Sequence, residues 1–223
     1  MNALVGERLS IITSKAQTTR HRILGIVNGD DFQVVISDTP GIIKPAYALQ
    51  ESMMDFVRSA LDDADVLIYM VEIGQKGLKD EAFLERIRKT KVPVLLLINK
   101  IDTSDQQTLE EQVDYWKELL PAAEIFPVSA LERFNIQSVF ERILELLPEG
   151  PPFFPKDQLT DRPERFFVSE IIREKILKHY KKEIPYSVEI EVESFEETEE
   201  IIRIGAVIMV ERDSQKGIII GHR

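Results

Sequence analysis

The 223-residue sequence contains no cysteine. This absence excludes disulfides, thiolate zinc sites, iron–sulfur ligation and cysteine nucleophiles, and it suits a reducing compartment. Histidine is scarce as well, because His21, His179 and His222 lie too far apart in the sequence to form a His-x-x-x-His metal pair. No apolar run approaches the roughly 20 residues that a membrane-spanning helix needs, and Glu7 and Arg8 bring charge too early for a signal peptide. We therefore expect a soluble, cytoplasmic protein.

Basic residues are the minority among the charged ones. The chain has 28 Lys and Arg against 39 Asp and Glu, which leaves a net charge of −11. This balance argues against a protein that coats nucleic acids, and we expect no DNA partner, although a local basic surface can exist on an acidic chain. Apolar residues make up 43% of the sequence, enough for the core of one large domain or two modest ones.

Short apolar runs alternate with helical patterns through residues 1–147. Two runs, 22–27 and 32–37, flank an Asn-Gly step, which is a strong hairpin signal. Later runs lack polar alternation, as is typical of parallel strands buried on both faces; they cover residues 66–71, 92–98 and 125–128. Helical spacing of apolar residues covers 50–62, 80–90, 106–120 and 136–147. This order predicts an α/β fold whose mostly parallel sheet has helices on both faces and strand-end loops along one edge.

A proline-rich segment at residues 148–160 interrupts this pattern, and we interpret it as a linker between domains 1–147 and 161–223. Asp161 and Glu164 resemble the capping box of a helix. The predicted helix carries an apolar stripe of Phe167, Ile171, Ile172, Ile176 and Tyr180. Residues 187–193 and 201–211 then read as strands, and a last apolar run covers 218–220. We expect an α+β unit in the order helix, strand, strand.

Asp38, Thr39, Pro40 and Gly41 come at the exit of the second hairpin strand. A carboxylate at such a position can hold Mg²⁺ through water, and a glycine N–H can approach a phosphate closely. The same residue types also form ordinary turns, so this motif is ambiguous when taken alone.

Two further motifs follow the next buried strands. In the sequence N-K-I-D, the Asp102 carboxylate can accept two hydrogen bonds from guanine, while the Lys100 stem can lie along the base and the Asn99 amide can brace a neighbouring loop. After the following strand, the Ala130 N–H can donate to the guanine O6, and Ser129 can stiffen the loop. Three such motifs on one predicted edge favour a guanine-nucleotide site over three unrelated turns.

The order D-T-P-G, N-K-I-D, S-A resembles the translation-factor-like branch of the P-loop GTPases. Residues 15–22 (KAQTTRHR) are similar to the first switch loop of the Era family of ribosome-assembly GTPases, and segments 169–175 and 185–188 are similar to the start of that family's RNA-binding KH domain. This resemblance covers essentially the whole chain, whereas a two-domain GTPase with another C-terminal module matches only 1–150. It implies a P-loop GTPase domain followed by a type II KH domain.

The resemblance also implies GTP or GDP and Mg²⁺ as ligands. Thr19, or alternatively Thr18, would ligate Mg²⁺ when the γ-phosphate is present. Asp38 would hold the same ion through water, and Gly41 would contact the γ-phosphate. Ile42 occupies the place where many GTPases have a water-positioning glutamine, so no catalytic side chain is assigned, and GTP hydrolysis is implied only for the intact family member.

The sequence departs from the family pattern at both ends. None of its ten glycines precedes a lysine, so it contains no G-x-x-x-x-G-K-[ST] motif. We expect the chain to begin after the P-loop and its preceding strand, which would leave two neighbouring strands with unpaired edges. We likewise expect only the start of the RNA-gripping G-x-x-G loop at residues 221–223, and therefore interpret the chain as an Era-type protein truncated at both ends, with a partial KH domain.

Basic residues of the second domain supply the candidates for RNA contact, although a solvated helix face explains them equally well. They are Arg173, Lys175, Lys178 and Lys182 on the helix, with Gly221, His222 and Arg223 in the loop. The leading hypothesis is a GTP-dependent switch that binds the 3′ end of 16S ribosomal RNA and the small subunit during 30S assembly. Peripheral association with the inner membrane is implied by the family. The alternative is a truncated RNA-binding or scaffold protein that does not bind nucleotide.

Overall fold

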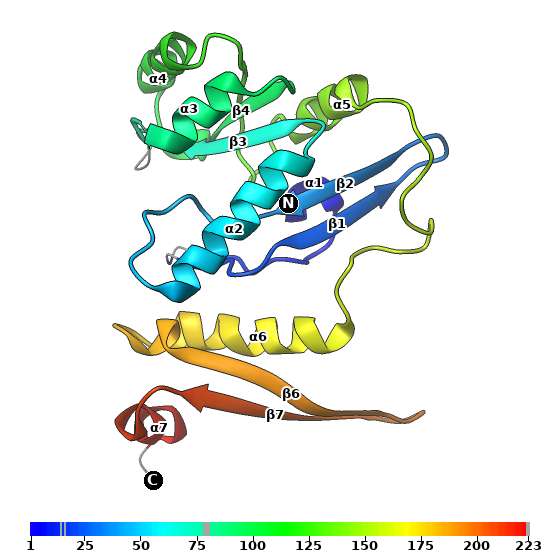
Figure 1. Ribbon diagram of the computed structural model, residues 1–223, viewed down its shortest axis with the longest axis vertical. Coiled ribbons are helices and arrows are strands. Elements are labelled where there is room, and N and C mark those ends of the chain that lie inside the picture. Colours follow the sequence, from blue (N-terminus) through cyan, green and yellow to red (C-terminus); the bar gives the residue numbers. More distant parts are fainter. Residues whose placement is uncertain (14, 16, 78–80, 222–223) are drawn as a thin grey trace.

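The computed structural model describes residues 1–13, 15, 17–77 and 81–221 (Figure 1). The N-terminal module consists of α1 (Asn2–Val5), β1 (Ile23–Asn28), β2 (Gln33–Asp38), α2 (Ala48–Asp63), β3 (Leu67–Glu72), α3 (Glu81–Lys89), β4 (Val94–Asn99), the 3₁₀ turn η1 (Ile101–Thr103), α4 (Gln106–Leu119), β5 (Glu124–Pro127) and α5 (Ile136–Leu146). The C-terminal module consists of α6 (Glu164–His179), the 3₁₀ turn η2 (Ile184–Tyr186), β6 (Val188–Glu197), β7 (Ile202–Val210) and α7 (Asp213–Ile220). Across the described ranges, no helix is both long and apolar enough to cross a membrane.

Strands β3, β4 and β5 form a parallel sheet with β4 in its centre. Residues 94–98 of β4 are all buried, which explains why this strand reads as an uninterrupted apolar run. Alternate residues of β4 face opposite sides: Leu96 packs in a cluster with Trp116 of α4, whereas Leu97 packs in a cluster with Val139 of α5. Helices therefore cover both faces of the sheet, as the sequence predicts.

Strands β1 and β2 form the predicted antiparallel hairpin, with Asn28 opposite Gln33. The proline-rich segment that follows α5 runs along this hairpin. The Ile26 N–H donates to the Leu159 carbonyl at 2.8 Å, and the Gln33 side chain accepts hydrogen bonds from the backbone N–H groups of Phe153 and Phe154. The linker is thus attached to the N-terminal module along its length.

A cleft of about 1860 Å³ lies between β2 and β3. In the described part of the chain, β2 pairs only with β1, and β3 pairs only with β4. The hairpin and the parallel sheet are consequently two separate sheets whose open edges line this cleft, which agrees with the unpaired edges expected from the sequence.

In the C-terminal module, α6 packs on the antiparallel pair β6–β7 (Figure 1). A small apolar cluster joins them, formed by Ile176 of α6, Ile184 of η2, and Val188 and Ile190 of β6. The predicted helix and two strands are therefore present, and α7 follows them.

Three details of this module differ from the sequence predictions. Ile171, expected in the apolar stripe of α6, is 56% exposed, because the buried face of α6 also contacts the N-terminal module through charged residues. Asp161 does not cap α6; its carboxylate accepts a hydrogen bond from the Leu24 N–H at 3.0 Å. The run 218–220 belongs to the helix α7. This helix was not predicted, because β-branched residues such as isoleucine favour strands and Gly217 is a poor helix former. The Gln215 side chain accepts a hydrogen bond from the Arg212 N–H at the start of this helix.

Candidate functional site

The ends of β4 and β5 bring the N-K-I-D and S-A motifs together. The Ser129 hydroxyl donates a hydrogen bond to the Asp102 carboxylate, and the Glu132 N–H donates to the Ser129 oxygen at 3.1 Å. Asp102 itself is exposed, while Ser129 is buried. The serine therefore fixes one carboxylate oxygen and leaves the Asp102 side chain facing solvent, where a ligand can reach it.

Asn99 braces this loop, as the sequence predicts. Its Oδ1 accepts a hydrogen bond from the Ala130 N–H at 3.0 Å. The Ala130 N–H was expected to donate to a guanine O6, but here it is directed at Asn99. A guanine O6 would have to share this N–H with Asn99 or displace the amide.

Lys100 has a left-handed backbone, with φ 66° and ψ 32°. Residues other than glycine seldom adopt this conformation, and such strain concentrates at functional sites. The Lys100 ammonium forms an ion pair with Glu72, which lies at the end of the neighbouring strand β3. The side chain thus lies along the same sheet edge as Asn99 and Asp102.

The D-T-P-G motif begins at the end of β2, which belongs to the hairpin and not to the sheet β3–β4–β5, so the prediction of three motifs on one sheet edge is confirmed for only two of them. The Asp38 carboxylate accepts a hydrogen bond from the Ser10 hydroxyl. Pro40 is buried, Thr39 is half-buried, and a Cβ added to Gly41 would meet no atom within 4 Å. This open space permits the close approach of a phosphate to the Gly41 backbone.

Thr18 and Thr19 precede β1 in the loop that the sequence analysis singled out for Mg²⁺. The Thr18 hydroxyl lies 3.1 Å from the Thr13 hydroxyl and donates to the Lys15 carbonyl at 2.6 Å, so it is engaged within the loop. Thr19 is half-buried and is the better candidate of the two. Among the described residues, no three His, Asp or Glu side chains gather as a metal site, so Mg²⁺ at Asp38 would depend on hydroxyls and on ligand oxygens.

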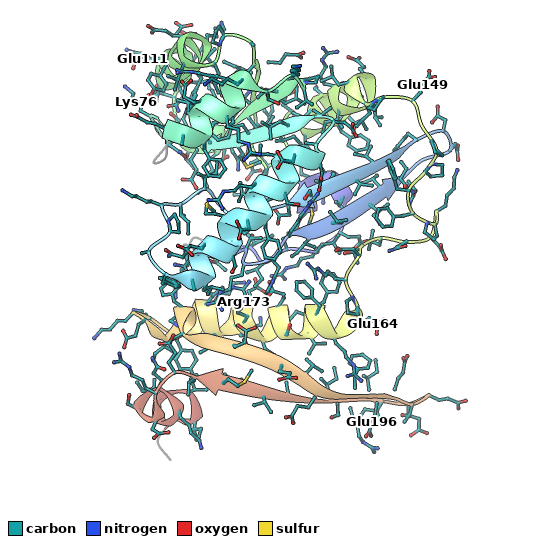
Figure 2. All side chains as sticks on the ribbon, viewed as in Figure 1. Lys76, Glu111, Glu149, Glu164, Arg173 and Glu196 are labelled. Atoms are coloured by element: carbon teal, nitrogen blue, oxygen red, sulfur yellow. The ribbon has the colours of Figure 1, made fainter. Side chains whose placement is uncertain are left out.

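The basic candidates for RNA contact separate into two groups by their exposure to solvent. Lys175 and Lys178 of α6 are exposed, and Lys178 forms an ion pair with Glu174 at 2.7 Å. Lys182 is exposed as well, but it was wrongly predicted to lie on the helix, because α6 ends at His179. Arg173 is only 4% exposed and lies on the side of α6 toward the N-terminal module (Figure 2). Because its guanidinium is used in protein contacts, the proposal that Arg173 binds RNA phosphates is wrong for this structure.

The loop candidates lie at the end of α7. Gly221 terminates this helix with φ 80°, a conformation that favours glycine. His222 and Arg223 lie outside the described residues.

Apart from Arg173, the buried charges between the modules were not singled out from the sequence. Arg20 and Glu174 are each 3% exposed, and Glu174 forms an ion pair with Arg8. Burial and the nearby Arg173 lower the pKa of Arg20, and burial lowers the pKa of His21 in the same region. The only sequence feature that could have indicated these buried charges is the i,i+3 spacing of Glu170 and Arg173. This spacing is common on solvent-exposed helices, so it does not predict burial.

Comparison with known proteins identifies both modules. A family model described as "50S ribosome-binding GTPase" matches residues 1–100, and a KH-domain model matches residues 183–223. The crystal structure of Era in complex with MgGDPNP and nucleotides 1506–1542 of 16S ribosomal RNA is 34% identical, with a TM-score of 0.92 over 99% of this chain and 76% of that chain. A variant of Aquifex aeolicus Era bound to GDP·AlF4⁻ is 35% identical, with a TM-score of 0.92 over 99% and 77% of the two chains.

These matches confirm a P-loop GTPase fold followed by a KH domain. Both structures exceed 30% identity over almost the entire chain, and both superpose with the two modules together. This protein belongs to the Era family of GTPases.

Proposed function

We propose that this protein is a guanine-nucleotide-dependent switch that binds the 3′ end of small-subunit ribosomal RNA during assembly of the 30S subunit. The observation that carries the proposal is the Asn99–Ala130 and Ser129–Asp102 hydrogen-bond pair, which joins two strand-end loops around one exposed carboxylate. The Era structure with MgGDPNP and 16S ribosomal RNA supports the same ligands for this chain.

The residues fit the base and the metal as follows. Asp102 would accept hydrogen bonds from the guanine N1–H and N2–H, and the aliphatic part of Lys100 would lie against the base. Asp38 and Thr19 would hold Mg²⁺, and the Gly41 N–H would donate to the γ-phosphate. Mg²⁺ would neutralise charge on the phosphates. Ile42 packs in the core beside Gly41, so the chain places no acid or base at that position.

The C-terminal module supplies the proposed RNA surface, with Lys175, Lys178 and Lys182 toward solvent and Gly221 at the end of α7. Association with the small subunit follows from this RNA. We propose a cytoplasmic location, supported by the absence of cysteine. Peripheral association with the inner membrane rests on family membership alone.

Nucleotide binding tests the proposal directly. Because the sequence has no G-x-x-x-x-G-K-[ST] motif and phosphate contacts dominate such sites, we expect residues 1–223 to bind fluorescent GDP more weakly than about 1 μM. The remaining binding should prefer GDP to ADP, because adenine cannot donate to Asp102 as guanine does. Competition titrations with the two unlabelled nucleotides measure this preference. Equal competition would favour the scaffold alternative, and micromolar or tighter binding would show that another loop holds the phosphates.

RNA binding gives a second prediction. Residues 1–223 should bind a single-stranded RNA of the 16S 3′-end sequence weakly, with affinity falling steeply between ~50 and ~200 mM salt. Replacing Lys175 and Lys182 by glutamine should reduce the slope of log K against log salt by about 2. The matched control replaces Lys91 and Lys117, two exposed lysines of the N-terminal module, and should leave the slope unchanged. Filter binding measures both, and equal slopes for the two variants would remove Lys175 and Lys182 from the RNA surface.

A further inference from the structure

We propose that Arg20 and Arg173 form a reciprocal clamp between the two modules, and that Arg173 is a positioning residue for the loop that carries Thr19. Each arginine belongs to one module and donates hydrogen bonds to backbone carbonyls of the other. The assignment of the loop as metal-binding rests on the proposed function, whereas the clamp itself rests on the contacts alone.

On one side of the clamp, Arg173 reaches from α6 to the N-terminal module. Its Nη1–H donates to the Gln17 carbonyl at 3.4 Å, and its Nη2–H donates to the Thr18 carbonyl. Glu170 holds the guanidinium in place through two hydrogen bonds of 2.7 Å each. A bidentate carboxylate fixes the plane of an arginine, so the remaining N–H groups have a defined direction.

On the other side, Arg20 reaches from the loop into the C-terminal module. It donates to three carbonyls, those of Val188 at 2.9 Å, Tyr186 at 3.0 Å and Pro185 at 3.2 Å. Its charge is balanced by Glu189 at 3.6 Å. Since Arg20 is 97% inaccessible to solvent, these contacts replace water at its two terminal nitrogens, whereas its buried Nε has no hydrogen-bond partner among the described residues.

Thr19 lies between the two anchored positions. The carbonyls of residues 17 and 18 are held by Arg173, and the side chain of residue 20 is held by η2 and β6. Two further contacts converge on the same loop: the Lys15 ammonium donates to the Tyr180 carbonyl, and the Tyr47 hydroxyl donates to Gln17 at 3.0 Å. Tyr47 immediately precedes α2, so the segment after the D-T-P-G motif also meets the loop here.

Gln17 adopts a left-handed backbone with φ 56°, which a side-chain-bearing residue maintains only when its surroundings hold it. Arg173 and Tyr47 are the contacts that do so. Release of the Arg173 contacts should therefore let the loop open without unfolding either module. By the same geometry, any ligand that orders Thr19 would also favour the observed placement of α6 and β6.

Limited tryptic digestion of the full chain, without nucleotide, tests the clamp through cleavage after Lys15 and Arg22. Arg173→Gln should raise the initial rate of cleavage at these sites about tenfold, which corresponds to about 1.4 kcal/mol of local opening. Arg173→Lys should restore less than half of the protection. A lysine ammonium lacks the planar set of N–H donors with which the arginine guanidinium binds Glu170 and two carbonyls at once. Arg165→Gln, at an exposed arginine of the same helix, is the matched control and should digest like the parent protein at both sites.

Trp116 fluorescence, which reports the N-terminal core, must stay native in every variant compared. The clamp is overturned if Arg173→Gln leaves the cleavage rate unchanged, if Arg165→Gln raises it equally, or if Arg173→Lys restores full protection. Arg20→Gln provides an independent arm: amide hydrogen exchange in residues 186–190 should accelerate, and unchanged exchange there would overturn the Arg20 half. None of these measurements contains nucleotide, so a failure of GTP binding cannot be mistaken for a failure of the clamp.

Discussion

Replacing Asp102 by asparagine is expected to change the base preference of the nucleotide site from guanine to xanthine. A carboxylate at this position accepts two hydrogen bonds from the guanine N1–H and N2–H groups. An asparagine can accept from N1–H but presents its own NH₂ to the N2 position, where xanthine carries an acceptor oxygen. Loss of the charged partner should weaken GTP binding by roughly 2–4 kcal/mol, or about 30- to 1000-fold.

The measurement is calorimetry with GTP and xanthosine triphosphate on a protein that carries a G-x-x-x-x-G-K-[ST] segment upstream of Met1. Asparagine retains an oxygen that can accept the Ser129 hydroxyl, so the loop geometry should survive the change. Asp105→Asn is the matched control: Asp105 caps α4 by accepting from the Thr108 N–H at 2.8 Å, and asparagine caps a helix equally well. An unchanged ratio of GTP to xanthosine triphosphate affinity in Asp102→Asn would remove Asp102 from the base site.

Leu96→Ala is expected to lower the free energy of unfolding of the N-terminal module by about 2–5 kcal/mol. Leu96 is 0% exposed in the central strand β4 and packs in one cluster with Tyr69 and Trp116. The parallel neighbours β3 and β5 limit collapse around the lost side chain, so a cavity should remain. Since β4 also carries Asn99 at its end, the substitution should weaken the nucleotide site without touching it.

Urea unfolding followed by the fluorescence of Trp116, the only tryptophan of the chain, measures this loss. Leu131→Ala removes the same atoms from a side chain that is 81% exposed, and it should change the free energy of unfolding by less than about 0.5 kcal/mol. A loss below 1 kcal/mol for Leu96→Ala would mean that β4 is not the rigid centre of the sheet.

Much of the fold and of the base site could be predicted from the sequence, for a local physical reason. The Asn28-Gly29 step determines a turn within four residues. An uninterrupted apolar run such as 94–98 is stable as a strand only when both of its faces are covered. Motifs that follow successive parallel strands must meet at one sheet edge. That rule predicts that Asn99 and Ala130 lie close together, and the two residues share a hydrogen bond in the structure.

The tertiary structure alone decided the roles of the buried charges. Arg173 looks like any basic residue of a solvated helix, because a sequence pattern does not say which of two partners a helix face will meet. The structure places it against the carbonyls of residues 17 and 18, which lie 155 or more positions away. Residues 218–220 are a second example: their local sequence predicts an apolar run without a helix, but in the structure they end the helix α7. Local sequence patterns reflect interactions between residues that are close in the sequence. The hydrogen bonds of Arg20 and Arg173 to distant backbone carbonyls depend instead on how the two modules pack, and this packing is determined only when the whole chain is folded.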